Sequence, residues 1–244
     1  MQLTIETDLG DAVHRKNLAE QLYDILENQI LDGTIRPGTK LSEENVADAF
    51  RVSRSPAREA ITELERIGLA ERMGARDRVV ATPTENFIRE TFEVWWILDA
   101  GRTYLASLDA DPADVARMRQ LLDEIDAADS TDVDGVQDKL TTEFHDLIHR
   151  GFKNDQLQQL LDHHRKYIRW FKELYFTATD RSPASRLEHR EIVDRFAAKD
   201  LMGLTDVIRR HVLRQRDEVL AHYAPAEPAA VAAGPRGRPS RPKA

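Results

Sequence analysis

The chain of 244 residues contains no cysteine. We therefore expect neither a disulfide framework nor thiol chemistry. The longest apolar runs, such as VWWIL at residues 94–98, are far shorter than the roughly 20 residues that cross a bilayer. The first residues, MQLTIETDLGDAVHRKN, have no apolar run after a basic start, so we expect no signal peptide. These absences favour a cytoplasmic protein.

The chain also lacks an excess of basic residues, since 43 acidic residues against 35 Lys and Arg leave a formal net charge of −8. This balance argues against polyanion binding over the whole surface, although it does not exclude a local basic face. With 41% hydrophobic residues the chain can build a core, and its length suits one large domain or two ordinary ones.

Residues 1–16 are polar and unpatterned, and we interpret them as a flexible N-terminus. From Asn17 the apolar residues fall on one helical face until Gly33. Ser42 is placed to cap a short helix, and Ser53 or Ser55 to cap the next. Residues 69–82 are then typical of two short strands around a tip at residues 74–77. Residues 17–82 therefore predict a winged helix-turn-helix with a β-hairpin wing.

No convincing strand pattern follows residue 82. Helical patterns cover six ranges, approximately 84–108, 112–128, 131–151, 154–178, 184–198 and 200–222. The fold class predicted is mostly α, with an all-α helical bundle at residues 84–223 behind the winged helix. Residues 224–244, rich in Pro, Ala and Arg, are interpreted as a disordered tail.

The second short helix begins with positive charge. Arg54 and Arg58 lie one helical turn apart near its start, where the helix dipole disfavours cations, so we expect an anionic partner. In a helix-turn-helix this end enters the DNA major groove, where arginine binds guanine or phosphate, and Ser53 and Ser55 can donate to phosphate oxygens. The alternative is an ordinary solvated face on which the arginines pair with glutamates of the same helix.

Three histidines are notable in the second half of the chain. His145, His189 and His211 fall on three different predicted helices, each beside apolar residues that point inward. Neutral imidazoles that converge from separate helices can hold a divalent ion, most often Zn²⁺. For any one of them, an ordinary core or surface histidine is the more frequent explanation.

Residues 17–82 resemble the DNA-binding domain of GntR-type bacterial transcription regulators. The matching motifs are PGxxLSE, VSRxPxREA and LxxxGL, in this order. The resemblance implies that Arg76 lies at the wing tip, where the family has Arg-Gly, but here Asp77 follows and its charge repels phosphate. Arg51 stands where glycine is common. The DNA-contacting positions implied by the resemblance are Glu44, Ser53, Arg54, Ser55 and Arg58.

Three segments resemble the FCD ligand-binding domain of the FadR subfamily, namely FHDLI, EHREIVDRFAAKD and RRHV. The resemblance implies a metal held by His145, His189 and His211 together with an Asp, whose position is taken here by Thr141. Trp95 stands where the family often has an arginine that neutralises the effector, and Arg165 matches another pocket arginine.

The function that the resemblance implies is a transcription regulator, a repressor on family grounds. It would bind a near-palindromic operator in double-stranded DNA as a homodimer and respond to a small carboxylate effector. One alternative is a metal-dependent enzyme that uses the three histidines, but no general base has an obvious spacing to them, so we predict no enzymatic activity. A second alternative is a scaffold whose winged helix binds protein, for which Arg54 and Arg58 together would have no purpose.

Overall fold

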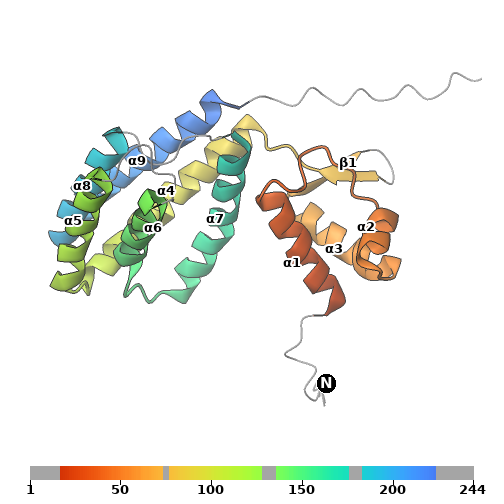
Figure 1. The fold of residues 1–244 in the computed structure, drawn as a ribbon, viewed down its shortest axis with the longest axis horizontal. Helices are drawn as coiled ribbons and strands as arrows, with labels where there is room; N and C mark the ends of the chain where they lie inside the picture. The colour runs from red at the N-terminus through yellow and green to blue at the C-terminus, as the bar shows by residue number, and fades with distance from the viewer. Residues whose placement is uncertain (1–16, 74–76, 128–135, 176–182, 224–244) are drawn as a thin grey trace, which may run out of the picture.

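The computed structural model describes residues 17–73, 77–127, 136–175 and 183–223. Figure 1 shows two units, a small one with the first helices and a hairpin, and a larger helical one. The first unit consists of α1 (Leu18–Leu31), α2 (Glu43–Phe50), α3 (Arg54–Arg66), β1 (Ala70–Met73) and β2 (Asp77–Val80). The second consists of α4 (Glu85–Leu108), α5 (Pro112–Ala127), α6 (Val136–His149), α7 (Asp155–Tyr175), α8 (Pro183–Ala197) and α9 (Leu201–Ala221).

Local capping explains where the first helices begin. Asn17 accepts a hydrogen bond from the backbone N–H of Glu20, whose side chain in turn accepts from the backbone N–H of Asn17, and this reciprocal pair forms a capping box. Ser42 caps α2 by accepting from the backbone N–H of Asn45 at 3.0 Å. Both starts are those predicted from the sequence.

The wing is a two-stranded antiparallel sheet. β1 pairs with β2 in a register that sets Ala70 opposite Val80 and Met73 opposite Asp77. Lys40, in the segment before α2, adds one bridge to Val79. The predicted hairpin is therefore confirmed, while its tip at residues 74–76 lies outside the described residues.

The helical unit is built around α4, the longest helix, which packs along α9 and against α7, while α5 packs between α6 and α8 (Figure 1). Thr84 and Asp200, the first residues of two predicted ranges, cap α4 and α9 with their side chains. The fold class is confirmed, and the six helices lie within a few residues of their predicted ranges. Thr131, the predicted start of the third of these helices, lies outside the described residues, as do the N-terminal segment 1–16 and the tail 224–244.

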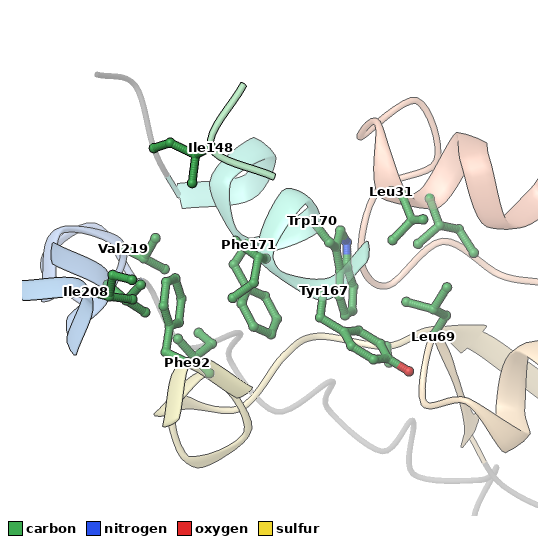
Figure 2. Close-up of a cluster of buried hydrophobic side chains, with 14 of the residues drawn as sticks. Leu31, Leu69, Phe92, Ile148, Tyr167, Trp170, Phe171, Ile208 and Val219 are labelled. Carbon is green, nitrogen blue, oxygen red and sulfur yellow. The ribbon is translucent and has the colours of Figure 1, made fainter. Parts of the chain in front are cut away.

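One continuous hydrophobic core joins both units, and α7 lies between them (Figure 1). Figure 2 shows Tyr167 and Trp170 of α7 beside Leu31 and Leu69 of the first unit, while Phe171 lies toward Phe92 of α4. Phe92, Trp170 and Phe171 are fully buried. None of the described helices is long and apolar enough to span a membrane.

Candidate functional site

The N-terminus of α3 presents two arginines to solvent. The side chains of Arg54 and Arg58 are 64% and 61% exposed. Arg54 binds Glu44 at 2.7 Å, and the Nε of Arg58 binds Glu43 at 2.9 Å. The hydrogen bonds from Arg58 lower the pKa of Glu43 below its ordinary value. Because exposed ion pairs contribute little to stability, the fold would lose little if another anion replaced these carboxylates.

The carboxylates that pair with these arginines differ from those considered in the sequence analysis. Arg54 and Arg58 pair with α2, which precedes α3, rather than with glutamates of their own helix. The hydroxyl of Ser55 donates to Glu59 at 3.1 Å. Ser53 holds the N-cap position of α3 but makes no side-chain capping hydrogen bond, so the fold of α3 does not use its hydroxyl.

Arg51 ends α2 in the left-handed backbone region, with φ of 55°. Side chains other than glycine, asparagine and aspartate adopt this conformation rarely, which explains why a glycine would suit the position. The turn directs the chain from α2 into α3 and so orients the start of α3.

The described part of the wing also carries cations. Arg72 and Arg78 both bind Glu65 of α3, at 2.5 Å and 2.7 Å. These hydrogen bonds lower the pKa of Glu65 and tie the hairpin to α3. Arg76, the predicted wing-tip contact, lies outside the described residues.

The helical unit contains a cavity of about 540 Å³ that is open to solvent on one side. Five residues predicted for the metal or effector site line it, namely Trp95, Thr141, His145, Arg165 and His211. The third predicted histidine, His189, is buried beside them. Its ring centroid lies 5.2 Å from that of His145 and 4.8 Å from that of His211. The fold therefore brings the three histidines together, although no group of three or more His, Asp or Glu side chains in the described chain is arranged to hold a metal ion.

His211 is held at both ring nitrogens. Its Nδ1 lies 2.9 Å from Glu188, and its Nε2 lies 2.9 Å from the amide nitrogen of Gln215. Since that amide nitrogen only donates, Nε2 accepts and Nδ1 carries the proton that His211 donates to Glu188. Burial raises the pKa of Glu188, but hydrogen bonds from His211 and Arg214 outweigh it and leave the pKa below its ordinary value.

A buried charged group on the cavity wall was missed in the sequence analysis. The side chain of Arg102 in α4 is 4% exposed and binds Asp99 at 2.5 Å. Its guanidinium carbon lies 5.7 Å from the ring centroid of Trp95, and its Nε has no hydrogen-bond partner among the described residues. Arg102 follows Trp95 by seven residues, two helical turns, so the spacing could have revealed it.

His149 adds a titratable group to this cluster, with its Nε2 3.5 Å from Asp99. Burial raises the pKa of Asp99, but His149 and Arg102 outweigh it and hold the pKa far below its ordinary range. For His149 itself burial dominates and lowers the pKa. The cavity wall thus holds an ionised carboxylate next to a neutral imidazole.

The charges on the cavity wall do not balance. Four cations line it, Arg102, Arg165, Arg169 and Lys172, against two carboxylates, Asp99 and Glu173. With neutral histidines the wall is therefore net positive, and it suits a small anion.

Comparison with protein families assigns both units. Residues 18–77 match the model described as bacterial regulatory proteins, gntR family, and residues 90–214 match the FCD domain. The chain belongs to the GntR family. GntR regulators bind DNA and FCD domains bind small-molecule effectors, so this GntR protein is a transcription regulator and not the metal-dependent enzyme considered as an alternative.

Curated relatives agree with this assignment. The uncharacterized HTH-type transcriptional regulator YdhC of Bacillus subtilis (strain 168) is 29% identical over 79% of this chain and 85% of its own length. The gluconate operon transcriptional repressor of the same organism is 34% identical over 55% of each chain.

Solved structures share the fold. Escherichia coli McbR/YncC superposes with a TM-score of 0.60 at 18% identity, over 86% of this chain and all of that one. A chain from Rhodococcus sp. RHA1, described as transcriptional regulator GntR, also gives 0.60, at 22% identity over 84% of this chain and 99% of that one. At these identities the likeness concerns the fold alone.

Proposed function

We propose that this GntR protein is a ligand-responsive repressor that binds a near-palindromic operator as a dimer, and that a small organic acid in the FCD cavity relieves repression. The observation that carries the proposal is the pairing of two cationic sites in one chain. One is exposed at the start of α3 and suits a large polyanion, and the other lines a cavity and suits a small anion. The name of one relative, a gluconate operon repressor, supports the sign of regulation.

On the DNA side, each subunit presents the start of α3 to one half-site. Arg54 and Arg58 exchange Glu44 and Glu43 for bases or phosphates, and Glu44 itself stands at a contact position. Ser53 and Ser55 donate to phosphate oxygens, and Arg76, outside the described residues, stays a predicted contact.

On the effector side, a carboxylate binds among Arg102, Arg165 and the other cavity cations. The Nε of Arg102 supports this assignment, because a buried N–H without a partner in the described chain is costly and a ligand oxygen would satisfy it. Trp95 contributes an apolar wall and Thr141 a hydroxyl beside the histidines.

We also propose a divalent ion, Zn²⁺ above others, at the end of the cavity formed by His145, His189 and His211. The Nδ1 of His211 already donates to a carboxylate, the usual state of an imidazole ligand. An ion on Nε2 would replace the hydrogen bond from Gln215. The ion would supply a charged anchor for the effector. Metal analysis should find about one ion per chain in wild type and none after His189→Ala and His211→Ala; a metal-free wild type would reject the ion and leave the cationic cavity as the effector site.

The dimer proposal rests on an apolar stripe of α4. Val94, Ile97, Leu105 and Leu108 are exposed on one face, and they lie four and seven residues on either side of Gly101. A Cβ built at Gly101 meets nothing within 4 Å. An antiparallel crossing of two copies at Gly101 would place Ile97 against the second copy's Leu105, a self-complementary contact of the kind that a two-fold axis requires.

Sedimentation separates this dimer from the alternative of a monomer. Ile97→Glu should yield monomers, whereas Leu187→Glu, at an exposed leucine of α8, should remain dimeric. Equal masses for the two variants would refute the stripe as the interface.

A binding experiment tests the effector proposal. A panel of small carboxylates, including gluconate and citrate, is screened by thermal shift with wild type and Arg165→Gln. At least one acid should stabilise wild type, fail to stabilise the variant and weaken operator binding of wild type. If no acid of the panel does so, the carboxylate proposal is wrong, while DNA binding itself stays intact.

A further inference from the structure

Helix α7 uses two faces for two purposes. Residues three or four positions apart share one face of a helix. Arg165, Ile168, Arg169 and Lys172 face the effector cavity. The residues between them, Lys166, Tyr167 and Trp170, instead contact the DNA-binding unit or lie beside it (Figure 2).

The first contact across this boundary is an ion pair between half-exposed Lys166 and buried Glu27. The Nζ of Lys166 binds both carboxylate oxygens of Glu27 in α1, at 2.9 Å and 2.8 Å. Glu27 is only 6% exposed and also accepts a hydrogen bond from Tyr23. Because Glu27 lies away from water, a displaced Lys166 leaves a buried charge unpaired, which is unfavourable.

The second contact reaches the C-terminal end of α3. The hydroxyl of Tyr167 donates to the carbonyl of Ile67 at 2.7 Å, and Ile67 is the C-terminal cap of α3. Trp170 is fully buried and lies beside Leu31, the last residue of α1 (Figure 2). Helix α7 therefore contacts both α1 and the end of α3 opposite to Arg54 and Arg58.

Two cavity residues come close to the turn after α1. A Cβ at Gly33 would lie 3.2 Å from the Cγ of Glu173. The pKa of Asp32 is lowered mainly by hydrogen bonds from Thr34, and the charge of Arg169 lowers it further. Glu173 and Arg169 of the cavity wall therefore lie near the turn that ends α1.

We propose that α7 couples the effector cavity to DNA binding, through Lys166–Glu27 and Tyr167–Ile67. The proposal rests on the proposed function and specifies its regulation. Arg165, Arg169 and Lys172 repel one another at helical spacing when the cavity is empty, and an anion removes that repulsion. Helix α7 then takes a different position, and the orientation of α1 and α3 follows because the two contacts and the shared core move with it. The anion changes DNA affinity only as far as it favours one of the two arrangements.

The test needs no identified effector, because neutral substitutions imitate a bound anion. Arg165→Gln with Lys172→Gln removes two cavity cations, and Lys139→Gln with Lys153→Gln removes two exposed cations elsewhere on the bundle. Both pairs change net charge equally. Each pair is made in wild type and in a background with Lys166→Met and Tyr167→Phe, which cuts both contacts. Affinity for the selected operator is measured at one salt concentration.

We expect the cavity pair to change operator affinity about 3- to 30-fold more than the surface pair, and this excess to vanish in the cut background. An equal effect of both pairs, or an excess that persists in the cut background, would overturn the coupling. If the double cut does not fold, Tyr167→Phe alone should reduce the excess, and an undiminished excess there overturns the coupling equally. Wild type that binds no operator would instead refute the proposed function.

Discussion

The arginines at the start of α3 and Arg102 in the cavity wall have opposite surroundings. Arg54 and Arg58 are about two-thirds exposed, and each holds a surface carboxylate that another anion can replace. Arg102 is 4% exposed, held by Asp99, with its Nε unsatisfied in the described chain. The proposed function assigns one residue type to two kinds of partner. Exposure suits a large polyanion, whereas burial with one unsatisfied donor suits a small ligand.

The largest expected effect is at the buried arginine. Arg102→Met should lower the free energy of unfolding by about 3–5 kcal/mol, because Asp99 would remain buried without its main cation. Urea denaturation measures it. Arg165→Met, at an exposed cavity residue, is the matched control and should be nearly neutral. Adding Asp99→Asn to Arg102→Met should restore part of the lost stability. Equal stability of Arg102→Met and Arg165→Met would contradict the difference between the buried and the exposed arginine.

At the exposed arginines the effect should fall on DNA binding and not on stability. Arg58→Ala should weaken operator binding roughly 5- to 100-fold, as expected when a base contact is lost. The urea midpoint should stay unchanged, because the Arg58–Glu43 pair is exposed. Fluorescence anisotropy with a labelled duplex measures the affinity. A shifted unfolding midpoint with unchanged operator affinity would show that Arg58 serves stability and not DNA binding.

Two N-cap residues, Asn17 and Ser53, should differ in the same way, one acting on stability and the other on DNA binding. Asn17→Ala should cost about 1 kcal/mol of stability, because it removes a capping box. Ser53→Ala should cost much less, since its hydroxyl makes no capping hydrogen bond, yet it should weaken operator binding. If Ser53→Ala matched Asn17→Ala in stability and left DNA binding intact, the hydroxyl would serve the fold and not the DNA.

The smallest expected effect is the pH dependence of stability that buried His149 causes. Burial lowers the pKa of His149, so the folded chain takes up fewer protons than the unfolded chain as pH falls below about 6.5. Stability contributed by neutral His149 is therefore present above that pH and declines below it. Urea midpoints at about pH 7.5 and 5.5 should differ more for wild type than for His149→Gln. The same difference in both would show that His149 does not titrate unfavourably.

Much of the fold follows from local sequence. Asn17, Ser42, Thr84 and Asp200 cap the helices that the sequence predicts, because a cap depends on neighbours within one turn. The histidines were found for a related reason, since each lies among apolar residues of a helix that must face inward.

The remainder depends on contacts that no local pattern encodes. The ion pair of Lys166 with Glu27 joins residues 139 positions apart. The glutamates that hold Arg54 and Arg58 come from α2, and helical spacing within α3 pointed to other partners. Spacing places Arg102 on the same helix face as Trp95, but its burial results from the packing of α4 against neighbouring helices, which the spacing does not show.

Selection of bound duplexes from a random pool tests the central claim most directly. The full chain is used at moderate salt, with Arg54→Ala plus Arg58→Ala as the control. The account predicts that wild type enriches an inverted repeat with half-sites about one helical turn apart, and that the control enriches nothing. No enrichment by wild type, or the same repeat enriched by the control, would contradict it.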